Sequence, residues 1–86
     1  MANKRLDDLD VWQRGLKLAE RVYIITRNPV FDKDWGLRDQ MRRAAVSIPS
    51  NIAEGFERNS DGDFNRFILI AKGSAAELSN PNYTRR

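Results

Sequence analysis

The stretch Gln40–Gly55 reads QMRRAAVSIPSNIAEG and carries the clearest structural pattern in this chain. Apolar side chains recur through it and around it at steps of three and four, which is typical of one face of an α-helix. These positions are Leu37, Met41, Ala44, Ala45, Ile48, Ile52 and Phe56. Pro49 interrupts the pattern, although an interior proline removes a backbone hydrogen bond and costs about 3 kcal/mol. We therefore predict a continuous but kinked helix through Pro49, held by tertiary packing, with Ser50 or Asn51 near the kink.

The sequence on both sides of this stretch predicts two further helices. Asn28-Pro29 ends the first of them, and Ser60, which stands three residues before an acid, caps the start of the last. No segment alternates between apolar and polar residues as a strand does. We therefore expect an all-α fold, an antiparallel helical bundle in a single domain. Its expected parts are helices at about 6–26, 34–57 and 61–78 and a polar tail at 79–86, within one domain of residues 1–86.

The first predicted helix is apolar over about half of its circumference. That arc is wider than the roughly 100° stripe of an ordinary surface helix. Gly15 and Ala19 lie at its middle, where small side chains let a neighbouring backbone come close. We therefore expect this helix to contact neighbours on two sides. Three helices of this size also leave apolar surface that a further copy of the chain is expected to cover.

The composition argues against several classes of function. The 86 residues contain neither cysteine nor histidine, so disulfides, thiolate metal sites and the commonest general base near neutral pH are all excluded. Carboxylates do not stand at the spacing of a calcium-binding loop, and we expect no metal, no cofactor and no catalytic residue. No apolar run approaches the ~20 residues of a membrane span, and Met1–Asp10 lacks the apolar core of a signal peptide. We expect a cytoplasmic protein that is not an enzyme.

Three ordered segments resemble one known family: Val11-Trp12, Arg42–Gly55 and Phe64–Leu78. It is the four-helix-bundle family encoded by intervening sequences of bacterial 23S rRNA genes, also labelled ribosomal protein S23-like. The family includes the accessory variability determinant of diversity-generating retroelements. The resemblance spans about residues 6–78 and implies an antiparallel bundle that assembles as a homopentamer. For accessory determinants it implies nucleic-acid binding on a basic surface and a reverse transcriptase as partner, whereas most other members have no assigned activity.

The chain departs from the family pattern after Leu78. Family members continue with more apolar helix, a turn and a fourth helix, whereas this sequence continues as SNPNYTRR over residues 79–86. The resemblance therefore leads us to expect a bundle that lacks the fourth helix. It also leads us to expect a homo-oligomer, with a pentamer as the family-based expectation.

Basic side chains are the candidate nucleic-acid contacts. The formal charge is +3, but residues 6–84 contain 11 basic and 12 acidic side chains, so an electrostatic footprint requires local clustering. The candidates are Arg38 and Arg42 on one helix face, Arg43 beside them, and Arg66 and Lys72 on the last helix. The alternative for the same side chains is pairing with acids of this chain or of a neighbouring copy. Binding of RNA or DNA therefore stands beside a purely structural role in protein–protein interaction.

Two other sets of residues have simpler explanations than catalysis or ligand binding. Ser47, Ser50, Asn51 and Glu54 flank the proline, without a histidine or lysine close in sequence to activate a serine. We expect them to satisfy backbone carbonyls freed by the proline. The aromatic side chains are expected to pack in the core or at an interface, with base stacking as the alternative. They are Trp12, Tyr23, Trp35, Phe56, Phe64 and Phe67.

Overall fold

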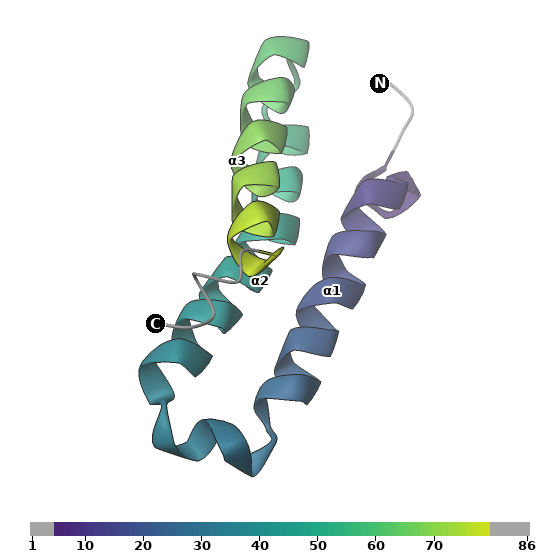
Figure 1. The fold of residues 1–86 in the computed structure, drawn as a ribbon. Coiled ribbons are helices and arrows are strands. Elements are labelled where there is room, and N and C mark those ends of the chain that lie inside the picture. Colours follow the sequence, from purple (N-terminus) through teal and green to yellow (C-terminus); the bar gives the residue numbers. More distant parts are fainter. Residues whose placement is uncertain (1–4, 80–86) are drawn as a thin grey trace.

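The computed structural model describes residues 5–79, which form three α-helices and two short 3-10 helices (Figure 1). They are η1 (Leu6–Asp8), α1 (Asp10–Thr26), η2 (Pro29–Lys33), α2 (Trp35–Glu57) and α3 (Asp61–Ser79). Residues 5–79 contain no strand, and the predicted all-α class is confirmed. Of the predicted polar tail, Ser79 ends α3 and the remainder lies outside the described residues.

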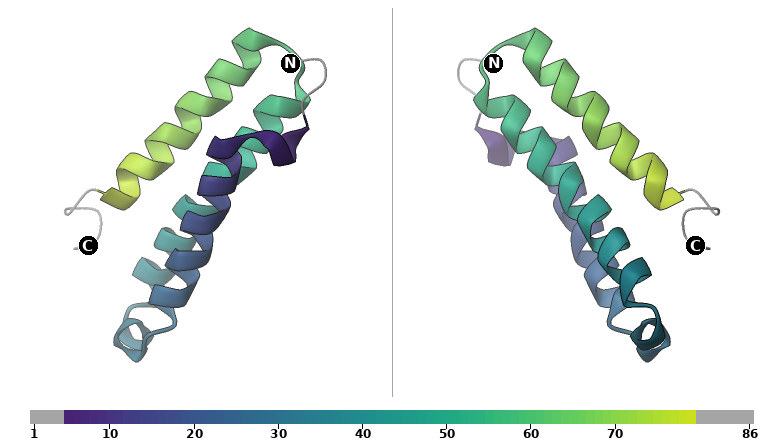
Figure 2. Two further views of the ribbon diagram at one scale, coloured as in Figure 1. Left: turned by 90° about the vertical axis from the view of Figure 1, so that its right-hand side faces the viewer. Right: turned by 90° about the vertical axis from the view of Figure 1, so that its left-hand side faces the viewer.

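The helix α2 is the central element of an open bundle. It runs antiparallel to α1 and to α3, whereas α1 and α3 make only marginal contact with each other (Figure 1). Figure 2 shows α3 diverging from the α1–α2 pair toward its C-terminal end. The radius of gyration is 14.3 Å, compared with about 12 Å for a compact domain of this length. Each outer helix therefore depends on α2 for most of its packing.

The helix α2 is continuous through Pro49, as predicted. The buried Pro49 lies against α1 at Gly15, where an added Cβ would be 3.2 Å from Cγ2 of Ile48 and 3.4 Å from N of Pro49. A glycine at this position therefore permits the two backbones to approach closely. The small residue predicted at the centre of the apolar arc of α1 has this role.

Asn51 stabilises the same turn of α2. Its Nδ2 donates to the carbonyl oxygen of Ser47 at 2.7 Å and to Oγ of Ser47 at 2.8 Å. The hydroxyl of Ser74 on α3 donates to the same Oγ at 2.9 Å. The proline removes the donor that would have paired with the carbonyl of Ala45. Asn51 bonds to the carbonyl of Ser47 and not to the freed carbonyl of Ala45. This corrects the expectation that the polar side chains beside the proline satisfy the freed carbonyl.

The hairpin of α2 and α3 requires an even closer approach at Gly55. An added Cβ there would lie 2.8 Å from Cβ of Phe67 and 3.3 Å from Cα of Phe64. The buried core is small and begins beside this contact. Its main cluster is formed by Ile48, Ile52 and Ala71, with Leu9, Trp12, Ile68, Ala75 and Leu78 packed against them. Val22, Ala44 and Ala45 are the other buried apolar residues.

The first α-helix begins later than the sequence predicts. The carboxylate of Asp8 accepts a hydrogen bond from the backbone N of Arg5 at 3.1 Å and closes the tight turn of η1. Leu9 is then extended, with φ −83° and ψ 111°, so that α1 starts at Asp10 and not near Leu6. An aspartate side chain can accept a hydrogen bond from a nearby backbone N–H and so stabilise a turn in place of the first helical turn. The spacing of apolar residues does not reveal such a bond, so it could not predict this later start.

Gly55→Ala is expected to lower the free energy of unfolding by about 1–3 kcal/mol, because the methyl group would force α2 and α3 apart. Gly73→Ala is the matched control, since nothing lies within 4 Å of a Cβ at that exposed position of α3. Removing glycine there is expected to raise the free energy of unfolding by about 0.5–1 kcal/mol. Urea unfolding followed by circular dichroism measures both changes. Two variants of equal stability would contradict the close approach at Gly55.

Candidate nucleic-acid interface

The fold separates the charges of the chain along its long axis. Residues 21–43, at the end of the molecule that holds η2, carry six basic and three acidic side chains (Figure 1). Residues 5–14 and 54–66 lie toward the opposite end and together carry four basic and seven acidic side chains. The molecule therefore has a positive end, defined as residues 21–43, and a negative end. The positive end is the candidate interface for an anionic polymer.

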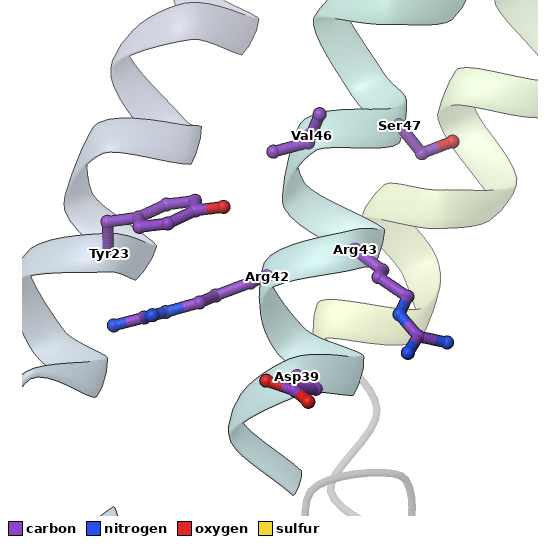
Figure 3. A pocket seen from close by; sticks show the side chains of 6 residues that line it. All are labelled: Tyr23, Asp39, Arg42, Arg43, Val46 and Ser47. Atoms are coloured by element: carbon purple, nitrogen blue, oxygen red, sulfur yellow. The ribbon is translucent and has the colours of Figure 1, made fainter. Parts of the chain in front are cut away.

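Arg42 connects α2 to α1 within the positive end. Its Nε donates to Oγ1 of Thr26 at 2.8 Å, and its guanidinium carbon lies 4.5 Å from the centroid of the Tyr23 ring. Thr26 is fully buried, and its hydroxyl donates to the carbonyl of Val22 at 2.7 Å. Figure 3 shows the Arg42 side chain running beneath the Tyr23 ring. This arginine is therefore part of the packing between the two helices.

Arg38 lies one helical turn before Arg42 and also contacts an aromatic ring. Its guanidinium carbon is 5.6 Å from the centroid of the Trp35 ring, and its Nη1 is 3.9 Å from Oδ1 of Asp32. The Nε is buried and has no hydrogen-bond partner within residues 5–79. The long ion pair and the unpaired donor leave this cation only partly neutralised.

Arg43 is exposed and points away from Arg42, so that the two adjacent arginines diverge (Figure 3). Both belong to the wall of a hollow of about 510 Å³ between α1 and α2. Its other lining residues are Tyr23, Asp39, Val46 and Ser47. This hollow is open to solvent and not an enclosed cavity.

The fold does not bring the two remaining basic candidates to the positive end. Arg66 lies toward the negative end, with its Nη2 3.6 Å from Oδ1 of Asp63 and its guanidinium carbon 5.3 Å from the Phe67 ring centroid. Lys72 is exposed in the middle of α3, two residues before Ser74. The five basic candidates therefore divide into three arginines on one helix and two separate cations.

The aromatic residues divide between packing and exposure. Trp12, Phe56, Phe64 and Phe67 are partly buried, in agreement with the packing expected from the sequence. Tyr23 and Trp35 are different, because they are 40% and 66% exposed. With this exposure neither ring belongs to the core of this chain, and each has an arginine beside it.

Thr26 is the residue of this site that the sequence analysis missed. It continues the buried stripe of α1, which includes Gly15 and Val22. A polar side chain on such a stripe requires a hydrogen-bond partner. The position of Thr26 on this stripe was the available signal. It indicates that the hydroxyl has a hydrogen-bond partner, and the structure provides the carbonyl of Val22 and the Nε of Arg42.

Metal and membrane sites are not found within residues 5–79. No group of three or more Asp, Glu, His or Cys side chains comes together there to hold a metal ion. No helix in this range is both long enough and apolar enough to cross a bilayer.

A comparison with protein families completes the description of this chain. The model of the family described as 23S rRNA-intervening sequence protein matches residues 7–84. The chain belongs to this family. The resemblance carried by the residues is therefore confirmed, and the family is one of small helical proteins not known as enzymes. The comparisons with curated proteins and with solved structures found no match.

Thr26→Val is expected to lower the free energy of unfolding of this family member by about 1–3 kcal/mol, because the part-buried Nε of Arg42 loses its acceptor. The valine keeps the branched shape of threonine, so packing changes little. Arg43→Gln, at the exposed neighbour of Arg42 on α2, is the control, since an exposed substitution is expected to change stability by less than about 0.5 kcal/mol. Thermal unfolding followed by circular dichroism compares the two. If both variants matched the parent, the Arg42–Thr26 bond would have no structural role.

Proposed function

We propose that this protein is a non-enzymatic helical module that assembles with further copies of itself and binds RNA or DNA through its positive end. The observation that carries the proposal is the exposure of large apolar side chains on both outer helices. On α1, Val11, Leu18 and Ile25 stand in line along one flank, and on α3 Leu69 and Ile70 are exposed. Burying one such side chain contributes about 1.5–3 kcal/mol.

The surface area of the chain supports self-assembly. The accessible surface is 6268 Å², about 1,000 Å² more than a compact monomer of this mass exposes. A second copy is the occupant that matches these flanks, because it presents the same apolar rows at the same helical spacing. A closed ring of copies, with the pentamer as the family-based proposal, would cover the flanks of every subunit.

The charge separation supports nucleic acid as the second partner. Phosphates attract clustered arginines, and their contacts position a protein without reading sequence. Copies arranged in parallel around a ring would place their positive ends on one face. Each copy would then add the weak electrostatic field of its positive end to the same face of the ring. Arg43 is the clearest phosphate contact, because it is exposed on the helix that also carries Arg38 and Arg42.

A purely structural role in protein–protein interaction is the second candidate. The observation that favours it is the engagement of two arginines within the chain. Arg42 is bonded to Thr26, and Arg38 lies beside Asp32. In this alternative the positive end contributes only to folding or to contacts between copies.

Self-assembly predicts that the parent chain sediments as a homo-oligomer at micromolar concentration. The double variant Ile25→Glu and Leu69→Glu is expected to sediment as a smaller species with unchanged helical circular dichroism, because both side chains are exposed in the single chain. Ionised carboxylates at a contact between copies are costly to desolvate. Analytical ultracentrifugation measures the mass. A parent that remains a well-folded monomer would contradict the proposal.

Nucleic-acid binding predicts that the parent binds a short RNA with an affinity that falls steeply as salt increases. Arg43→Gln is expected to reduce the slope of log affinity against log salt by about 0.7 for each phosphate of a single strand that the variant no longer neutralises. Lys72→Gln is the control, because Lys72 lies outside the positive end. Fluorescence anisotropy over a salt series measures both slopes. Absence of binding at moderate salt by the assembled parent would favour the purely structural alternative.

A further inference from the structure

Two exposed aromatic rings lie at the positive end, and each is paired with an arginine. Trp35 is 66% exposed and lies 5.6 Å from the guanidinium carbon of Arg38. Tyr23 is 40% exposed and lies 4.5 Å from that of Arg42. Because the arginines are four residues apart on one helix, they stand about 6 Å apart along its axis. The two pairs therefore follow one another along the same side of α2.

We infer that these two pairs form a stacking platform for unpaired bases of a single-stranded nucleic acid. The inference rests on the proposed function and adds the class of ligand. Proteins that bind single strands combine aromatic rings, on which bases stack, with cations that follow the backbone. A tryptophan that is two-thirds exposed does not contribute to folding in proportion to its size. The guanidinium of Arg38 beside this exposed ring favours a ligand that is flat and anionic.

The surroundings of Tyr23 leave room for a base. Arg42 occupies one side of the ring (Figure 3), and the ring borders the hollow of about 510 Å³. Asp39 and Ser47 line that hollow. The carboxylate of Asp39 can accept a hydrogen bond from the edge of a base, and the hydroxyl of Ser47 can donate one. A second hollow of about 300 Å³ adjoins the same ring on the side of α1.

A duplex fits this arrangement less well than a single strand. Bases within a duplex are stacked on one another, so that their faces are closed to an aromatic side chain. Phosphates alone would then contact the protein, and Trp35 would contribute little. The platform therefore predicts a preference for single strands, which a purely electrostatic surface does not have.

The test compares a labelled single-stranded RNA with the duplex of the same sequence by fluorescence anisotropy. The parent is expected to bind the single strand more tightly. Trp35→Leu is expected to weaken that binding by about 5-fold to 150-fold, the effect of removing one base stack, while the salt slope stays unchanged. Val30→Ala is the matched control, because Val30 is an apolar residue at the same end and is 73% exposed. It is expected to leave the affinity unchanged.

The outcomes separate this inference from the proposed function. Equal binding of the single strand and the duplex, unaffected by Trp35→Leu, would overturn the platform and leave nucleic-acid binding standing. Failure of the parent to bind either probe would reject the proposed function itself. A change in the sedimentation of the Trp35→Leu variant would assign Trp35 to a contact between copies, and would overturn the inference. Quenching of the parent's tryptophan fluorescence by the single strand alone would support it.

Discussion

The close approach of α1 to the proline turn of α2 is the contact on which the rest of the structure depends. Pro49 leaves α2 without one backbone hydrogen bond, and the missing side chain of Gly15 allows the backbone of α1 to pack there. Gly55 has the same function toward α3 a turn and a half later. Two glycine contacts, one at Gly15 of α1 and one at Gly55 of α2, therefore hold the outer helices against α2. Glycine stabilises the fold at these two positions because it has no Cβ, and a Cβ there would meet atoms of the facing helix.

The open shape follows from this arrangement. Both outer helices pack on α2 and hardly touch each other, so only a few side chains are fully buried. Apolar residues on the outer flanks of α1 and α3 are left exposed, although such residues ordinarily stabilise a helix by burial. The polar contacts between helices are therefore more important than in a larger domain. The Ser47–Ser74 and Thr26–Arg42 hydrogen bonds each fix one outer helix against α2.

Much of this fold could be predicted from local pattern. The three helices, the continuity of α2 through Pro49 and the close packing at Gly15 all follow from periodicity and from the size of single residues. The start of α1 could not be predicted in this way, because a bond between Asp8 and the backbone of Arg5 replaces the first helical turn. The candidate site was predicted only in part. Arg42 was identified as a basic residue on a helix face, but its partner Thr26 lies on another helix.

The sequence by itself determined the helices, the place of the proline, and the family to which the chain belongs. Side-chain periodicity and backbone preferences act over a few residues, so they can be read directly along the chain. Only the tertiary structure decided where the negative charges gather and which aromatic rings stay exposed. Residues 5–14 and 54–66 are far apart in sequence, and antiparallel packing places both toward the negative end. Trp35 and Tyr23 carry the same apolar signal as core residues, but the burial of a ring depends on whether a neighbouring helix covers it.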